Sequence, residues 1–226
     1  MTEMGQARTE ELIARLVEDA RPVRPLRPPL VRMLAWLAVA AVVIGIAVAI
    51  AGLRPGLAQQ MADPTRLVSW LASLATGLSA AVAAFHVGLP DRSRAWALLP
   101  LPGLVLWLGT IGYGCLADWL RQGPGGLAPG VSMGCMISII AMSVPLTGVF
   151  LVMMRHAGPV RPVATIATGV LATGGLAAAG LALFHEADGA MEALVWHGGT
   201  IAVLVGLATL FNRRLFGLAA PRPALG

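Results

Sequence analysis

"LAWLAVAAVVIGIAVAIAGL", residues 34–53, contains no charged side chain over its whole length. A helical run of about 20 apolar residues matches the ~30 Å hydrocarbon thickness of a bilayer. Five further runs of this kind follow, and none alternates apolar and polar residues as a membrane β-strand does. We therefore expect an all-α, polytopic membrane protein. The six predicted transmembrane helices are Leu34–Leu53, Leu67–Leu89, Ala97–Leu116, Met133–Met154, Val163–Phe184 and Leu194–Phe211.

The composition of the whole chain indicates the same class. The mean hydropathy of its 226 residues is +0.78, 57% of them are hydrophobic and only 12% are charged. A soluble domain cannot bury that much apolar surface. The first apolar run follows a long polar stretch and exceeds the length of a signal-peptide core. We therefore expect this run to stay in the mature protein.

The distribution of arginine predicts the orientation. All 16 basic residues are arginine, and an even number of spans places both termini on one side. That side holds thirteen arginines, whereas the other holds only Arg54, Arg66 and Arg121. Because basic residues stay on the cytoplasmic side, both termini are expected in the cytoplasm. The chain then divides into a cytoplasmic segment (1–33), a membrane domain (34–212) and a cytoplasmic tail (213–226).

Small residues recur at helical spacing in two of the predicted spans. Such rows let helices approach closely in lipid, where no hydrophobic force acts between them. We therefore expect both rows to pack inside the bundle, and a dimer face is the alternative. The first row is Ala72, Thr76, Ala80 and Ala84, and the second is Gly198, Ala202 and Gly206.

The sequence contains no pattern typical of a catalytic or cofactor site. There is no metalloprotease motif, no phosphate-binding glycine loop and no pair of intramembrane carboxylates. His197, in "WHGG", is expected to bond a neighbouring helix. The span interiors also lack the acid or arginine that pumps and charged-solute transporters use. We expect no enzyme, cofactor or metal centre, and a small-solute or metal-ion transporter remains the alternative function.

The two cysteines, Cys115 and Cys135, are predicted near the outer ends of the third and fourth spans. A glycine- and proline-rich loop between them would allow a disulfide in an oxidising compartment. Closing that loop would contribute about 3 kcal/mol in the chain-entropy model. Two buried thiols and a redox- or metal-responsive pair are the alternatives. The ligands are too few to predict a closed zinc site.

The N-terminal segment predicts a short amphipathic helix. Leu12, Ile13, Leu16 and Val17 share one helical face, and Thr9 is the expected N-cap. The helix is expected to end before Pro22. Four prolines between residues 22 and 29 then favour an extended strap that leads to the membrane.

A three-turn helix is marginal alone in water, so its apolar stripe needs a partner. The acidic side chains of the segment disfavour an anionic membrane surface. The protein's own loops are too short to form a groove. A soluble cytoplasmic partner that accepts a helix in a groove fits best. The arginines of the strap anchor the topology, and a second role against an acidic partner surface is an open alternative.

Five motifs carry a resemblance to a known family. They are "LIARLVEDARPVRPLRPP" (12–29), "RSRAWALLPLP" (92–102), "YGCLADW" (113–119), "SMGCMIS" (132–138) and "LVWHGG" (194–199). In order and spacing they resemble the NrsF-like family of six-helix bacterial membrane proteins, which are negative regulators of sigma factors. The resemblance extends over nearly the whole chain.

The resemblance implies an anti-sigma factor of the bacterial inner membrane, without direct nucleic-acid contact. It would hold an extracytoplasmic-function (ECF) sigma factor at the membrane and release it under redox or heavy-metal stress. The implied partner-binding residues are Leu12, Ile13, Leu16, Val17, Arg21, Arg24 and Arg27. Deleting residues 1–33 would abolish that function, whereas a transporter would tolerate the deletion.

One position departs from the family pattern. The last outer loop of the family often holds a cysteine, where this chain has "FHEADGAME" with His185. The candidate sensing residues are therefore Cys115, Cys135 and His185. Either the two cysteines form the responsive pair, or Cys135 and His185 act together as soft ligands.

Overall fold

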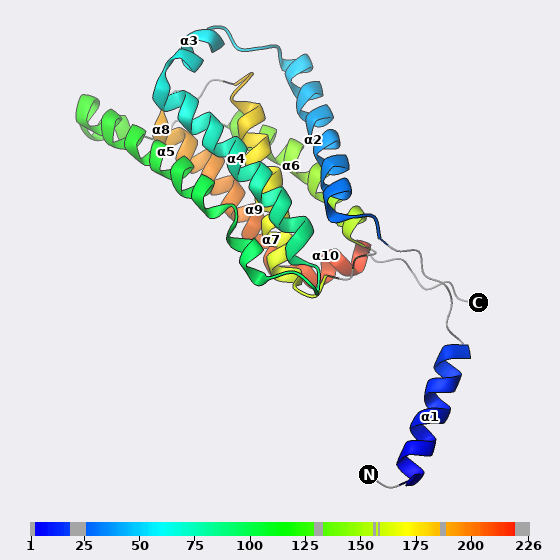
Figure 1. Cartoon of the computed structure of the whole chain (residues 1–226). Coiled ribbons are helices and arrows are strands. Elements are labelled where there is room, and N and C mark those ends of the chain that lie inside the picture. Colours follow the sequence, from blue (N-terminus) through cyan, green and yellow to red (C-terminus); the bar gives the residue numbers. More distant parts are fainter. Residues whose placement is uncertain are drawn as a thin grey trace.

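A computed structural model describes residues 3–18, 26–128, 133–155, 157, 159–185 and 189–219. The described residues form helices and connecting turns (Figure 1). In chain order the elements are α1 (Glu3–Glu18), α2 (Pro29–Ala51), α3 (Leu57–Ala62), α4 (Pro64–Val87), η1 (Arg94–Leu98), α5 (Leu101–Gln122), η2 (Gly123–Leu127), α6 (Met133–Met154), α7 (Pro162–Leu181), α8 (Ala190–Glu192), η3 (Ala193–Gly198), α9 (Gly199–Leu210) and α10 (Asn212–Ala219).

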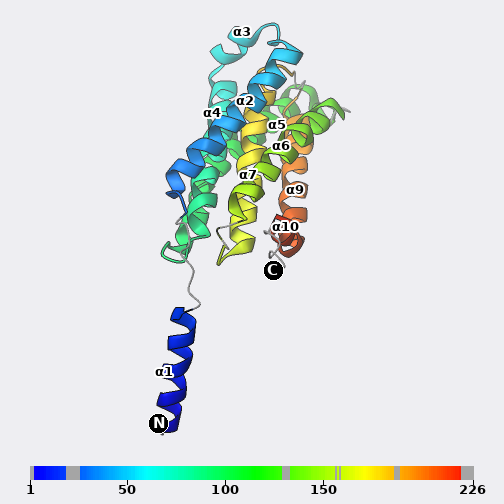
Figure 2. The ribbon, with the colours of Figure 1, turned by 90° about the vertical axis from the view of Figure 1, so that its right-hand side faces the viewer.

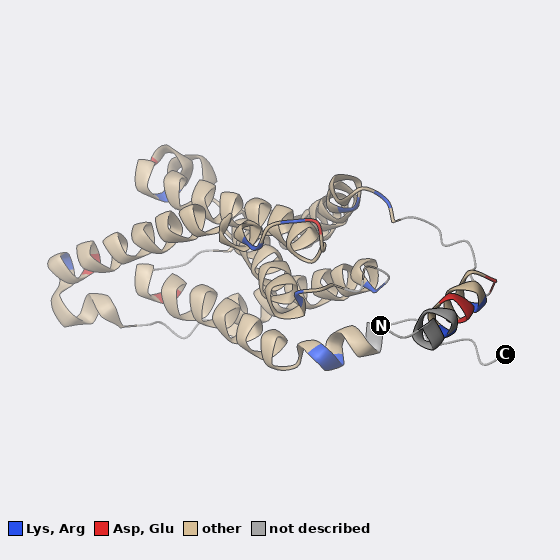
Figure 3. Cartoon of the chain, turned by 60° about the horizontal axis from the view of Figure 1, so that its bottom comes forward, with Lys and Arg blue, Asp and Glu red and all other residues tan. Residues whose placement is uncertain are grey.

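Six helical stretches are long and apolar enough to cross a membrane. This confirms the predicted all-α fold with six membrane helices. Several helices begin earlier than predicted, at Pro29, Pro64 and Pro162. Proline suits the first helical position because the N–H that it lacks would have no partner there. Charged side chains gather at the ends of the helices and on α1, while the central stretches lack them (Figure 3).

Helix α7 is the central element of the bundle. Fifteen of its 20 residues are buried, and it packs against α4, α6 and α9 (Figure 2). The contact with α4 is the most extensive in the molecule. At its centre the two backbones nearly touch, since a Cβ added to Gly175 would lie 2.9 Å from the backbone nitrogen of Gly77. Glycine at both positions makes this approach feasible.

The first predicted row of small residues is confirmed. Ala72, Thr76, Ala80 and Ala84 are all buried in α4. The second row is wrong, because Ala202 is exposed and Gly206 has open space where a Cβ would lie. Here α7 supplies the small residue, Gly174, and α9 supplies a large one, Ile201. Two helices can pack closely when only one of them has small side chains at the contact.

Two side chains near the start of α2 fix it to α6. The guanidinium of Arg32 donates to the carbonyl of Met153 and lies 5.6 Å from the ring centroid of Phe85. One turn later, the indole nitrogen of Trp36 donates to the carbonyl of Leu146 at 3.1 Å. A buried arginine in this position satisfies a carbonyl of the last turn of α6, which has no partner within its own helix. We call this contact the Arg32 clamp.

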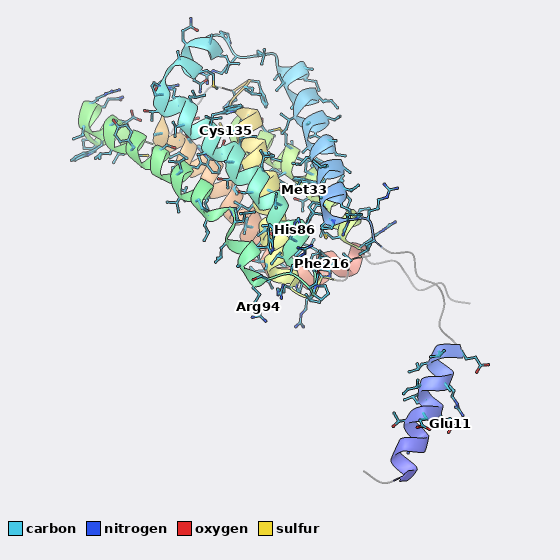
Figure 4. The ribbon with its side chains drawn as sticks, viewed as in Figure 1. Glu11, Met33, His86, Arg94, Cys135 and Phe216 are labelled. Carbon is cyan, nitrogen blue, oxygen red and sulfur yellow. The ribbon has the colours of Figure 1, made fainter. Side chains whose placement is uncertain are left out.

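Helix α10 occupies the first part of the predicted tail. Its residues Leu215 and Phe216 pack against the hydrophobic cluster that contains Met33, Trp36 and Met154. In Figure 4, Phe216, His86 and Arg94 lie toward this end, and Cys135 lies toward the other. We call the first the α10 end and the second the pocket end, for the cavity described below.

Candidate functional site

Helix α1 stands apart from the bundle (Figures 1 and 2). It begins at Glu3, six residues before Thr9, so the prediction of Thr9 as its N-cap is wrong. Arg15 and Glu11 form an ion pair of 2.7 Å, and both are exposed.

The apolar stripe of α1 is exposed to solvent. The four predicted residues lie on this one helix, and their exposed fractions are 57% for Leu12, 54% for Ile13, 63% for Leu16 and 68% for Val17. Isolated exposed leucines are ordinary, but four neighbouring apolar side chains on a short helix form a surface that favours burial by a partner. Complete burial of each would contribute roughly 1.5–3 kcal/mol.

The arginine strap is only partly within the described residues. Arg21 and Arg24 lie outside them. Arg27 is exposed and comes just before Pro28, in the extended residues 26–28 that lead into α2. Arg27 is therefore two residues from the helix whose Arg32 forms the clamp to α6.

A cavity of about 310 Å³ opens at the pocket end. Its wall combines α4, α5 and α7 with the residues around α8 and η3. The charged and titratable residues that line it are Arg54, Asp63, Arg66, Tyr113, Asp118, Arg121, His185 and His197. The backbone nitrogen of Ala190 donates to Asp118 at 3.3 Å, which joins the start of α8 to α5.

His197 lies in η3, a π-helical turn within the sixth membrane helix. Turns of this kind occur frequently at functional sites. The predicted hydrogen bond from His197 to a neighbouring helix is not formed at Nε2, which is buried without a partner among the described residues. His197 is one of the residues that line the cavity.

Cys115 and Cys135 are not joined by a disulfide, and both are buried in one hydrophobic cluster. Cys115 lies in α5, and Cys135 lies in the first turn of α6. Ile139 and Leu181 belong to the same cluster. Both thiols are buried, as one of the alternatives from the sequence expects, and the redox- or metal-responsive pair stays a prediction.

Three potential ligands meet beside this cluster. The Sγ of Cys135, a ring nitrogen of His185 and a carboxylate oxygen of Glu192 all lie within 4.8 Å of one another. We call these residues the Cys–His–Glu group. The pairing of Cys135 with His185 was one of the alternatives predicted from the sequence, and Glu192 was missed. No pattern around Glu192 distinguishes it from the other acids of the loop, because only the fold brings it to Cys135.

The sequence was compared with family models, with curated proteins and with solved structures. The model of the NrsF family, described as negative regulator of sigma F, matches residues 16–217. No curated protein and no solved structure matches. The matched region contains the whole bundle, the strap and the second half of the α1 stripe. The chain therefore belongs to the NrsF family of negative regulators of sigma F.

Proposed function

We propose that the protein is a membrane anti-sigma factor that sequesters an ECF sigma factor with helix α1. The observation that carries this proposal is the exposed stripe of Leu12, Ile13, Leu16 and Val17 on a helix that stands apart from the bundle. A negative regulator of a sigma factor must contact that factor or something that controls it. An amphipathic helix that docks in a groove is a common way to do so.

The strap supplies the charge for this contact. Arg21, Arg24 and Arg27 follow the stripe and would face an acidic surface of the sigma factor, blocking its access to RNA polymerase or promoter DNA. Charges at the rim of an interface mainly steer the encounter and fix its register. The apolar stripe therefore supplies most of the affinity, and the arginines raise the rate of association and set the orientation of the complex.

This function requires the α10 end to face the bacterial cytoplasm. The arginine distribution supports that orientation, with Arg27, Arg94, Arg213 and Arg214 all at the α10 end. The cavity would then open to the opposite side of the inner membrane, where a stress signal arrives. The capture helix and the sensing residues would then lie at opposite ends of the bundle.

Helix α6 extends from the pocket end of the bundle to the α10 end. Cys135 is in its first turn, at the pocket end. Met153 and Met154, which Arg32 contacts, are in its last turn, at the α10 end. Arg32 is in the first turn of α2, a few residues after the strap. A displacement of α6 would therefore reach the strap through the two buried contacts that Arg32 and Trp36 make with α6. Packed helices transmit such shifts because their interfaces have few alternative arrangements.

The Arg32→Met variant tests this connection. Methionine retains volume but cannot donate to the carbonyl of Met153, so the last turn of α6 should no longer be tied to the first turn of α2, while the hydrogen bond of Trp36 still holds the two helices together. We expect the variant to bind the sigma factor normally and to lose its release under redox or heavy-metal stress. Transcription of a sigma-dependent reporter, measured with and without stress, checks this. The exposed Arg213 offers the matched control, Arg213→Met, which should release normally. Normal release by Arg32→Met would contradict the connection.

The function itself is tested by cell fractionation. The full chain should hold the sigma factor in the membrane fraction, and a deletion of residues 1–20 should move it to the soluble fraction and raise target transcription. This deletion keeps the strap and the Arg32 clamp, so insertion and topology are preserved. Unchanged retention after the deletion would rule out capture by α1. A transporter would show no effect of the deletion on its own activity.

A further inference from the structure

We propose that the cavity at the pocket end and an apolar groove beside it bind one anionic phospholipid, with the head group in the cavity and an acyl chain in the groove. The two spaces are continuous, since Thr65, Thr110 and Tyr113 line both. This lipid site goes beyond the proposed function and does not depend on it, because it rests on the shape and charge of this end of the bundle alone.

The arginines of this side of the membrane converge on the cavity. Of the 16 arginines, the predicted topology assigns only Arg54, Arg66 and Arg121 to this side, and all three line the cavity. They come from separate parts of the chain: the segment between α2 and α3, the first turn of α4 and the last turn of α5. Basic pockets between membrane helices bind the head groups of anionic lipids. The volume of about 310 Å³ is in the range of small-ligand sites.

The two aspartates of the cavity already accept hydrogen bonds from the backbone. Asp63 accepts from the nitrogens of Thr65 and Arg66, at 2.8 and 3.4 Å, and so caps the start of α4. Asp118 accepts from the nitrogen of Ala190 at 3.3 Å. Both carboxylates therefore serve the ends of helices, and the three guanidinium charges exceed the two carboxylate charges.

Two of the arginines have charge to offer to a ligand. Arg66 and Asp63 are 3.8 Å apart with side chains that are 53% and 48% exposed, and such exposed pairs contribute little. Arg121 forms no ion pair within the described residues. Arg54 differs, because its guanidinium donates to the carbonyl of His185 at 3.4 Å. We therefore assign the phosphate of the head group to Arg66 and Arg121.

The groove lies between α4 and α5 and suits an acyl chain. Besides the three shared residues, it is lined by Pro64, Val68, Val105, Leu106 and Gly109. Val105 and Leu106 are exposed on the side of α5 that faces the lipid. Helix α5 extends away from the bundle at this end, which leaves the groove open along its length (Figure 1). A soluble anion would have no use for such a groove, whereas the chain of a lipid would lie in it.

The head group, rather than the chain, should determine which lipid binds. Lipid chains are as apolar as the groove, so the exchange of one chain for another gives no net hydrophobic gain. Each arginine near a membrane surface favours an anionic lipid by about fivefold. Arg66 and Arg121 together therefore predict a preference of about 25-fold for an anionic over a zwitterionic head group with the same chains.

The test is native mass spectrometry of the purified full-length protein in detergent, titrated with phosphatidylglycerol and with phosphatidylcholine of the same chains. We expect one tightly bound phosphatidylglycerol per chain, with an affinity about 25-fold above that of phosphatidylcholine. Arg66→Gln and Arg121→Gln should each reduce this preference about fivefold. Arg94→Gln is the matched control, because it removes the same charge at the α10 end. Equal affinity of the wild-type protein for the two lipids would overturn the site.

A second pair of variants tests the groove. Gly109 lines it, and a Cβ added there meets nothing within 4 Å. Gly109→Leu should therefore fold, fill the groove and lose the tightly bound phosphatidylglycerol. Gly112→Leu is the matched control, because Gly112 is also in α5 with open space at its Cβ but lines neither the cavity nor the groove. Equal binding by these two variants would overturn the placement of the chain.

Three further ligands identify the source of the anion. Phosphatidylethanolamine, palmitate and glycerol phosphate are each titrated against the phosphatidylglycerol complex, and all three should displace it only weakly. Displacement by phosphatidylethanolamine at equal concentration would overturn the preference for an anionic head group. Displacement by palmitate would assign the site to a free fatty acid, and displacement by glycerol phosphate would assign it to a soluble anion; either result would overturn the phospholipid. None of these results bears on the capture of the sigma factor by α1.

Discussion

Replacing Leu16 by Asp is expected to weaken the binding of the full-length protein to its sigma factor by about 100-fold or more, because one anchor is lost and a charge enters an apolar groove. Leu16 lies near the middle of the α1 stripe, and 63% of its side chain is exposed in the free protein. The substitution therefore removes no contact within the bundle. Calorimetry or surface binding with the protein in nanodiscs measures the change.

Ala14→Asp is the matched control for this experiment. It introduces the same side chain on the same helix, on the exposed side that faces away from the stripe. Its affinity should stay within about threefold of wild type, since a rim charge has small effects. Equal losses for the two variants would indicate that helix formation or net charge determines binding, and would contradict a stripe-in-groove contact.

Replacing Gly175 by Leu is expected to lower the free energy of unfolding by about 3 kcal/mol or more, since overpacking that must move a backbone exceeds ordinary side-chain strain. An added Cβ would lie 2.9 Å from the nitrogen and 3.0 Å from the Cα of Gly77. The α4–α7 contact is the largest in the bundle, so its separation exposes the core. Thermal unfolding in detergent, followed by circular dichroism, measures the effect.

Gly206→Leu gives the comparison for Gly175→Leu. Gly206 also lies in a membrane helix, α9, but a Cβ there meets nothing within 4 Å. The same substitution should leave the midpoint of unfolding close to wild type. A stable Gly175→Leu protein would mean that α4 and α7 are not packed as the structure describes.

The sequence predicted the six membrane helices because span length and hydropathy are local properties. It was less accurate at the ends of helices. The predicted start at Leu34 excluded Arg32 from the first span, since arginine is costly in lipid. Arg32 is nevertheless helical and buried, because the carbonyl of Met153 accepts its hydrogen bond and the ring of Phe85 lies beside it. The helix start therefore depends on a hydrogen-bond acceptor in α6, which the local sequence around Arg32 does not show.

The α1 stripe was predicted from local periodicity, and the structure exposes it as expected. The Cys–His–Glu group was only partly predicted, because it depends on three distant segments. Nothing near Glu192 shows that it lies beside Cys135. The second row of small residues failed for a related reason, since the sequence does not show which helix of a pair supplies the large side chain, as Ile201 does for α9.

Hydrogen exchange on the full-length protein in nanodiscs, with and without the sigma factor, tests the central claim most directly. A short helix alone in water opens often, so the amides of α1 should exchange rapidly in the free protein. Docking of the stripe should slow them by at least about tenfold in the complex. If the sigma factor binds while the α1 amides exchange as fast as before, another part of the protein captures it and α1 is not the capture helix.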